Sequence, residues 1–318
     1  MFAAFLTTIF FSLSAIFANR SIKAVGSTRA NLGRLLVAAL VLGIYAHTVG
    51  HGLSGSATPW LLLSGLIGMG LGDLASFGAL PILGSRLTVL VTQCVAAPLA
   101  AVAEYLWLGT TMSPLQILWS AVILAGVGFA LMPSKAHPPR VRIRPIGFLW
   151  GLAAAAGQGI GAVLSRKASD VAAEAGQALD GITGAYQRIL GGLVITVAFF
   201  AIRGSVVEWR RRQSIFSLAR VSSATANDSG SSPAVLAPSG RDYLWIPLNA
   251  LCGAIIGVSC YQWALFTTPS GLVLPIVATT PLVIVPLAFW IEKERPTRRS
   301  LVGAVIAVAG AVALTQVR

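Results

Sequence analysis

The chain has 318 residues, of which 56% are hydrophobic and only 10% are charged, and its mean hydropathy is +0.80. Soluble globular domains carry about 25% charged residues, so this composition excludes a soluble enzyme or binding domain and indicates an integral membrane protein. The net charge of +13 could suggest nucleic-acid binding, but the basic residues lie almost entirely in connections between apolar segments. We therefore expect the lipid bilayer, and no nucleic acid, as a partner of this chain.

Ten apolar segments are long enough, or nearly so, to cross a bilayer as helices. A membrane-spanning helix needs roughly 20 apolar residues. The segments are continuously apolar rather than alternating, which argues against the strands of a β-barrel. We predict an all-α integral membrane protein with ten transmembrane helices, near residues 2–18, 32–49, 60–80, 84–108, 115–132, 146–164, 183–202, 244–266, 270–291 and 300–316.

Basic residues are distributed unevenly among the connections. They gather after the first, fifth, seventh and ninth helices, whereas the connections after the second, fourth and eighth contain no Lys or Arg. Because basic loops stay in the cytoplasm, both termini are predicted to lie outside, in a multi-pass protein of the inner (plasma) membrane. One connection departs weakly from the pattern, since the segment after the sixth helix holds Arg166 and Lys167.

The C-terminal half of the sequence repeats the N-terminal half. Pro98–Gly126 matches Pro281–Gly310, and the segment around Arg34 is echoed by the segment around Arg188. Five helices per half is an odd number, so the second half must insert upside down, and equivalent loops do exchange their charge. Such inverted repeats usually build a binding site at their interface, near the middle of the membrane.

The repeat sets the expected domain boundaries. We predict a first five-helix repeat over residues 1–133 and a second over 134–318. A stretch within the second repeat, at about 204–241, is rich in Ser, Ala and Pro and is expected to form a disordered cytoplasmic loop.

Asp73 is the most distinctive candidate for a functional residue. It lies about 13 residues into the third predicted helix and so near the middle of the bilayer, at roughly 1.5 Å rise per residue. An ionisable group there is costly and by default faces the bundle interior or a water-filled cavity. We interpret Asp73 as a proton carrier or a counter-charge for a cationic substrate. The alternative is an interhelical hydrogen bond that only holds helices together.

The same stretch, Gly70-Leu71-Gly72-Asp73, matches the GxGD signature of intramembrane aspartyl proteases. That chemistry needs two carboxylates that share a proton, whereas the other aspartates lie in predicted loops and the proteases' Pro-Ala-Leu element is missing. We keep a protease as a disfavoured alternative and expect no enzyme, no catalytic residue and no cofactor. The three cysteines lack the spacing of a zinc cluster, so no metal site is expected.

Three further charged residues are candidates for gating or interface positions. Glu104 lies late in the fourth helix, where it either lines an outer vestibule or, as we favour, reaches the lipid headgroups. Arg34 and Arg188 occupy equivalent repeat positions, so inversion points them toward opposite faces of the membrane. Each either extends to its own interface or binds an acidic partner as part of a gate.

Uncharged polar groups within the helices complete the set of candidates. They would bind a substrate where they face a cavity, or connect helices where they do not; they are Gln93, Gln158, Tyr261, Gln262, Thr279 and Thr280. Pro98 and Pro281 are repeat-equivalent, so we expect the fourth and ninth helices to flank the pathway symmetrically. The glycine pairs Gly68/Gly72 and Gly157/Gly161 are typical of close helix crossings.

Each half resembles an EamA repeat of the drug/metabolite transporter superfamily. Such a repeat ends with a proline-containing helix, a Leu-Gly-Glu-Arg-x-Thr turn and a Gly-rich helix. The second half matches at Pro281, Glu294, Arg295, Thr297, Gly303 and Gly310. The first matches at Pro98, Gly109, Ser113, Gln116 and Gly126, with Thr110 and Trp119 in place of the glutamate and the helix glycine.

The resemblance implies a secondary transporter that moves a small polar metabolite or drug by alternating access. Its partners would be a small-molecule substrate and a candidate coupling proton, with Asp73 as the coupling or substrate-facing carboxylate. The sequence holds no GxxxxGK[ST] motif, so it gives no support to ATP hydrolysis by this chain.

The distribution of basic residues predicts the outcome of a fusion experiment. A reporter that works only in the cytoplasm, fused after Arg318, should give no signal, because both termini are expected outside. The same reporter inserted in the basic connection after the seventh helix should be active. A strong signal from the C-terminal fusion would overturn the predicted orientation.

Overall fold

The computed structural model describes residues 1–132, 144–221, 242–284 and 298–317. Within these ranges, nine helices are long and apolar enough to cross a membrane. They span Phe2–Val25, Arg29–Thr48, Thr58–Gly84, Leu87–Leu108, Pro114–Leu131, Pro145–Glu174, Gly181–Ile202, Trp245–Thr267 and Arg298–Gln316. A shorter apolar helix covers Ser270–Ile284. The predicted all-α membrane fold is confirmed, and residues 285–291 of the ninth predicted helix lie outside the described residues.

The first half contains five spans, two of which meet without a loop. The third span changes from α-helix to π-helix and back, and the chain then turns at Gly84, whose φ of 77° favours glycine. A capping box formed by Ser113 and Gln116 starts the fifth span. The elements are α1 (Phe2–Val25), α2 (Ser27–Thr48), α3 (Thr58–Gly65), η1 (Leu66–Leu71), α4 (Gly72–Leu108) and α5 (Pro114–Leu131).

The second half has the same order of elements. They are α6 (Pro145–Glu174), α7 (Gly181–Val221), η2 (Asp242–Leu244), α8 (Trp245–Asn249), η3 (Ala250–Gly257), α9 (Val258–Thr267), α10 (Ser270–Val277) and α12 (Arg298–Gln316). Helix α6 continues past the predicted end at 164, so Arg166 and Lys167 lie in a helix and not in a connection. Helix α7 extends to Val221 and covers the start of the segment expected to be a loop, whereas 222–241 lies outside the described residues.

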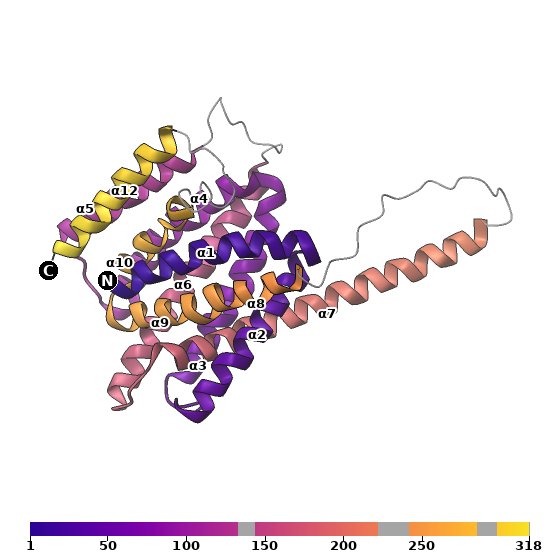
Figure 1. The fold of residues 1–318 in the computed structure, drawn as a ribbon, viewed down its shortest axis with the longest axis horizontal. Helices are drawn as coiled ribbons and strands as arrows, with labels where there is room; N and C mark the ends of the chain where they lie inside the picture. Colours follow the sequence, from indigo (N-terminus) through magenta and orange to yellow (C-terminus); the bar gives the residue numbers. More distant parts are fainter. Residues whose placement is uncertain (133–143, 222–241, 285–297, 318) are drawn as a thin grey trace.

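Equivalent helices of the two halves pack against one another. Helix α5 lies along α12, and α2 packs against α7 (Figure 1). The π-helices η1 and η3 lie at matching positions of the two repeats, with Gly68 and Gly72 in one corresponding to Gly253 and Gly257 in the other. The ends of the chain lie near each other in Figure 1.

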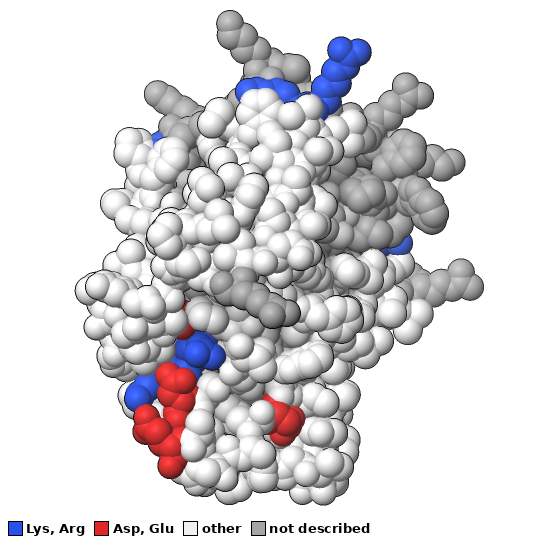
Figure 2. Space-filling view, turned by 90° about the vertical axis from the view of Figure 1, so that its left-hand side faces the viewer, with Lys and Arg blue, Asp and Glu red and all other residues white. Residues whose placement is uncertain are grey.

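A wide part of the described surface carries no charged side chain. On the face shown in Figure 2, red residues lie in the lower third beside blue ones, and other blue residues lie at the top, with an uncharged region between. Large apolar side chains such as Leu40, Leu106 and Val305 are 67%, 76% and 69% exposed. Such extensive exposure of apolar groups suits a surface in contact with lipid.

The two glycine pairs expected at a helix crossing pack against each other. A Cβ atom on Gly157 would lie 2.8 Å from the Cα of Gly72, and one on Gly161 would lie 3.0 Å from the Cα of Gly68. The third span and α6 therefore approach so closely that their backbones are in contact. This contact fixes the position of Asp73, which follows Gly72 directly.

The ninth span is interrupted, and the first span contacts it on both sides of the interruption. Helix α10 ends at Val277, and the next helix begins at Thr280 after a turn. Hydroxyl groups of α1 bind backbone carbonyls on both sides of this break and so join the first and ninth spans. The Thr8 hydroxyl donates to the carbonyl of Ile276 (3.2 Å), and the Ser12 hydroxyl donates to that of Thr280 (3.0 Å).

The glycine contact leads to a prediction about stability. Replacing Gly161 by Ala should destabilise the protein by roughly 1–3 kcal/mol, because the added methyl group meets backbone atoms that cannot rotate away. Gly128→Ala is the matched control, since its Cβ would have only Leu90 Cδ1 within 4 Å, at 3.9 Å. Thermal unfolding in detergent compares them. Equal melting temperatures for the two variants would show that the crossing is looser than described.

Candidate functional site

Asp73 lies at the start of α4, in the middle of the third span, and faces α2. Its carboxylate oxygen Oδ2 is 3.9 Å from Nη2 of Arg34, and the two side chains are 32% and 20% exposed. Arg34 also donates to the side-chain oxygen of Asn31 at 2.8 Å. The Arg34 side chain thus turns to a carboxylate within the protein instead of extending to the membrane interface.

Two cavities meet at this ion pair. Their volumes are about 630 and 250 Å³, and both are lined by Asn31, Asp73 and Phe77. The larger cavity adds the aromatic rings of Trp150 and Phe199. The smaller is more polar, since Arg34, Ser76 and Asn249 contribute to it. An apolar cavity with a few convergent polar groups is the usual form of a small-molecule site.

Arg188, the repeat counterpart of Arg34, has different surroundings. It is only 5% exposed and donates from Nη1 to Gln262 Oε1 (3.0 Å) and to Ser165 Oγ (3.2 Å). Its guanidinium carbon lies 5.1 Å from the centre of the Tyr261 ring, a cation–π contact. Among the described side chains, no carboxylate lies within 4.0 Å of it. Arg188 therefore does not extend to the interface either.

The structure brings together only some of the polar residues that the sequence pointed to. Tyr261 and Gln262 surround Arg188, as described above. The hydroxyls of Thr279 and Thr280 donate to carbonyls of their own helix, at 2.6 Å in both cases. Gln93 and Gln158 are half-buried and form no hydrogen bond with the described residues.

Ser165 and Ser64 belong to the Arg188 cluster and were not among the residues expected from the sequence. The two hydroxyls are 2.9 Å apart, and Ser64 donates to the carbonyl of Gly161 at 2.6 Å. A signal was present, because Ser64 precedes Gly68 by one helical turn and Ser165 follows Gly161 by one turn. Both serines therefore continue, by one helical turn, the spacing of small residues that the pairs Gly68/Gly72 and Gly157/Gly161 define.

Glu104 is buried, which contradicts the expectation that it reaches the headgroups. It is 2% exposed, and its Oε1 lies 3.3 Å from Nε of Arg166. Its other oxygen accepts from the backbone N–H of Ser270 at 2.7 Å and from the Ser270 hydroxyl. Arg166 also donates to the carbonyls of Leu265 and Phe266. These bonds connect α4, α6 and the turn between α9 and α10, so the buried carboxylate is fully partnered.

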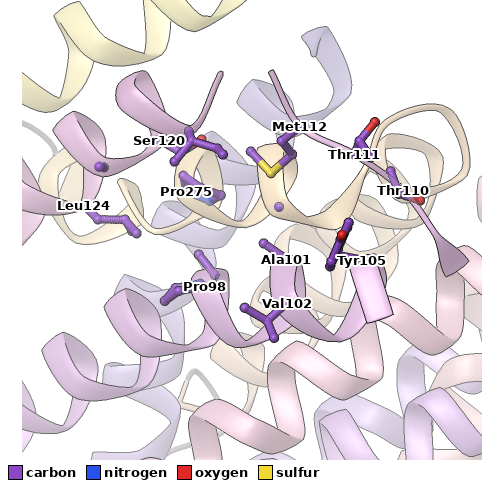
Figure 3. Close-up of a pocket in the computed structure, with 14 residues that line it drawn as sticks. Pro98, Ala101, Val102, Tyr105, Thr110, Thr111, Met112, Ser120, Leu124 and Pro275 are labelled. Atoms are coloured by element: carbon purple, nitrogen blue, oxygen red, sulfur yellow. The ribbon is translucent and has the colours of Figure 1, made fainter. Parts of the chain in front are cut away.

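A third cavity, of about 460 Å³, lies between α4, α5 and α10 (Figure 3). In Figure 3, Pro98, Ala101 and Val102 on α4 lie across from Ser120 and Leu124 on α5, with Pro275 and Met112 beside them. Pro98 lines this cavity, but its repeat counterpart Pro281 does not, and Pro275 of α10 lines it instead. The symmetric arrangement of the fourth and ninth helices around the pathway stays a prediction. No described residue of its lining is charged, so it suits an apolar group better than a polar substrate.

Comparisons with known proteins agree with this architecture. Among 29 matching solved chains, one crystal structure with 16% sequence identity and a TM-score of 0.71 covers 99% of this chain and 96% of its own. At this identity the likeness shows the fold alone. No curated protein matches the sequence. The model of the EamA-like transporter family matches residues 1–132 and 145–316, one stretch in each half. The chain therefore belongs to the EamA-like transporter family.

Proposed function

We propose that this protein is a secondary transporter that moves a small polar metabolite or drug across the membrane by alternating access. The observation that carries the proposal is the Arg34–Asp73 ion pair, which lies within the bundle at the junction of two cavities. Ionisable groups inside membrane bundles mark substrate and ion pathways. The inverted repeats supply two equivalent halves that can move relative to each other.

Arg34 and Arg188 differ in whether a substrate could reach them, and this difference supports alternating access. Arg34, near the end of the bundle that carries Arg20, Lys23 and Arg29, lines a cavity, whereas Arg188 is buried. At the opposite end, the Glu104–Arg166 ion pair ties three helices together. In the described conformation a cavity reaches Arg34 near the basic end, and the Glu104–Arg166 ion pair joins helices near the other end. If the two repeats exchanged these conformations, Arg188 would line a cavity and Arg34 would be buried, so that the substrate would reach the site from the other side of the membrane.

The composition of the larger cavity suggests how a substrate would be held. The rings of Phe77, Trp150 and Phe199 offer apolar contact, and Asp73 and Thr196 supply polar groups. Asp73 would either face a cationic group of the substrate or carry a coupling proton. Its partner Arg34 would be released for other contacts when Asp73 is occupied, which links the charge of the site to the position of α2.

The alternative, an intramembrane aspartyl protease, has less support. A protease of this kind needs a second carboxylate beside Asp73, but the partner of Asp73 is a guanidinium. The other carboxylate buried in the described part of the bundle, Glu104, is occupied by Arg166 and Ser270. We therefore propose that the protein is not an enzyme. We also propose an inner (plasma) membrane location with both termini outside.

The test of the proposed function is the variant Asp73→Asn. Growth of cells that overproduce the protein, across a panel of amino acids, sugars and toxic analogues, first identifies a transported compound. Uptake of that compound into proteoliposomes under an imposed pH gradient is then measured. Asn keeps the size and hydrogen-bonding capacity of Asp but not its charge, so we expect at least a ~100-fold lower rate of coupled uptake from protein that still folds.

Two controls separate function from structure. Glu174→Gln removes an exposed carboxylate at the end of α6 and should leave uptake unchanged. The double variant Asp73→Asn, Arg34→Gln removes both charges of the ion pair. If Asp73 only neutralised Arg34, the double variant would recover uptake, whereas a carboxylate that acts on substrate or proton predicts no recovery. Uptake by Asp73→Asn at the wild-type rate would remove Asp73 from the mechanism.

A further inference from the structure

Two residues in contact in the Arg188 cluster each have a buried hydrogen-bond donor without an acceptor. Nε of Arg188 and Nε2 of Gln262 have no hydrogen-bond partner, although their residues are 5% and 0% exposed. Leaving a buried donor unpaired is destabilising, and more so when the group is charged. Both unpaired atoms are donors, so the missing group is an acceptor.

The orientation of the Gln262 amide is fixed by its neighbours. Its Oε1 lies 3.0 Å from Nη1 of Arg188 and 3.2 Å from the hydroxyl of Ser165. Rotating the amide by 180° would place its NH2 group against the guanidinium, where two donors would face each other. The unpaired atom of Gln262 is therefore the nitrogen, and the two free donors belong to neighbouring side chains.

The charge balance of the cluster leads to the same conclusion as its unpaired donors. In the first repeat, Arg34 has a carboxylate partner, because position 73 is Asp. The glycines Gly68/Gly72 and Gly253/Gly257 set the register between the repeats, and in this register Val258 replaces Asp73. Arg188 thus keeps the arginine of the repeat and lacks its carboxylate. Asp73 acts on Arg188 only through space and without contact, so a negatively charged group placed against the buried guanidinium would stabilise it further.

We infer that Arg188 and Gln262 form an anion site that binds a carboxylate group of the transported substrate. One carboxylate oxygen would accept from Arg188 Nε and the other from Gln262 Nε2, with Ser165 and Tyr261 holding the guanidinium in place. Both side chains are buried, so a ligand reaches them only when the surrounding helices separate. The inference rests on the proposed function, because alternating access supplies that separation.

The first experiment places a carboxylate in the site permanently. In the variant Gln262→Glu, one oxygen keeps the bonds from Arg188 and Ser165 while the other takes the position of the unpaired nitrogen. We expect the melting temperature in detergent to rise by roughly 2–4 °C, as the new ion pair forms inside the protein. An unchanged or lower melting temperature for Gln262→Glu would contradict the inference.

Gln187→Glu is the matched control. Gln187 is 1% exposed and donates from Nε2 to the carbonyl of Gly52 at 2.8 Å, and its unpaired atom is the acceptor Oε1. Adjacent helical residues do not face each other, so a glutamate at 187 does not reach Arg188. The same substitution should therefore lower the melting temperature at 187 and raise it at 262. A rise at both positions would mean that added negative charge alone stabilises this basic protein.

The second experiment tests binding with defined probes. Benzoate and benzamide have nearly the same shape, but only benzoate carries a charge. We expect benzoate, and not benzamide, to raise the melting temperature of the wild-type protein, and we expect Gln262→Glu and Arg188→Gln to lose this effect. Equal stabilisation by both compounds, or retention of the benzoate effect in Gln262→Glu, would overturn the inference.

The binding readout also distinguishes the inference from the proposed function. Thermal stabilisation by benzoate needs no transport, so it can be present in a protein that moves nothing across a membrane. Benzoate-dependent stabilisation that is lost in Gln262→Glu, together with no uptake of any compound in the panel, would support the anion site and reject the transporter. Coupled uptake that is unaffected by Gln262→Glu would reject the anion site and leave the transporter.

Discussion

The constraint on which this structure depends is that lipid offers no hydrogen-bond partner, so every polar group inside the bundle must find one in the protein. Three arginines find such partners to different extents. Arg166 pairs with the buried carboxylate of Glu104 and with two carbonyl groups, and Arg34 lies 3.9 Å from Asp73 beside a cavity. Arg188 has only neutral acceptors and one unpaired N–H group. These three arrangements form a series from a fully partnered arginine to a buried arginine with an unpaired N–H group.

Close packing of small residues makes these arrangements possible. Because Gly68 and Gly72 contact Gly161 and Gly157 directly, the third span and α6 bring Ser64 and Ser165 within 2.9 Å of each other. That hydroxyl pair then lies within reach of Arg188 from α7. The interrupted ninth span is joined to the first in a similar way, since hydroxyls of α1 donate to the carbonyls of Ile276 and Thr280. Polar side chains in this bundle thus partner the backbone as well as each other.

The features that follow local rules could be predicted from the sequence. Apolar length predicted the helices, and the four glycines predicted a close crossing. The same sequence could not show which side chains meet, because this depends on the rotation of each helix. Glu104 was expected at the headgroups, yet α4 turns it toward Arg166, and Thr279 and Thr280 were expected near a substrate, yet they bond to their own helix. Partners supplied by distant segments, such as Ser270 for Glu104, leave no local pattern that could reveal them.

The two repeats differ in the partners of their equivalent arginines. A strictly symmetric pair of inverted repeats would present the same groups to both faces, and the two open states would bind a substrate equally well. Here, position 73 carries a carboxylate and the matching position 258 carries Val, so the two arginines face unlike partners. A substrate with an anionic group would then gain more from Arg188 than from Arg34, whose charge is already balanced. The helical framework is duplicated, whereas the carboxylate beside Arg34 has no counterpart beside Arg188, so any binding preference between the two halves must come from these charges and not from the framework.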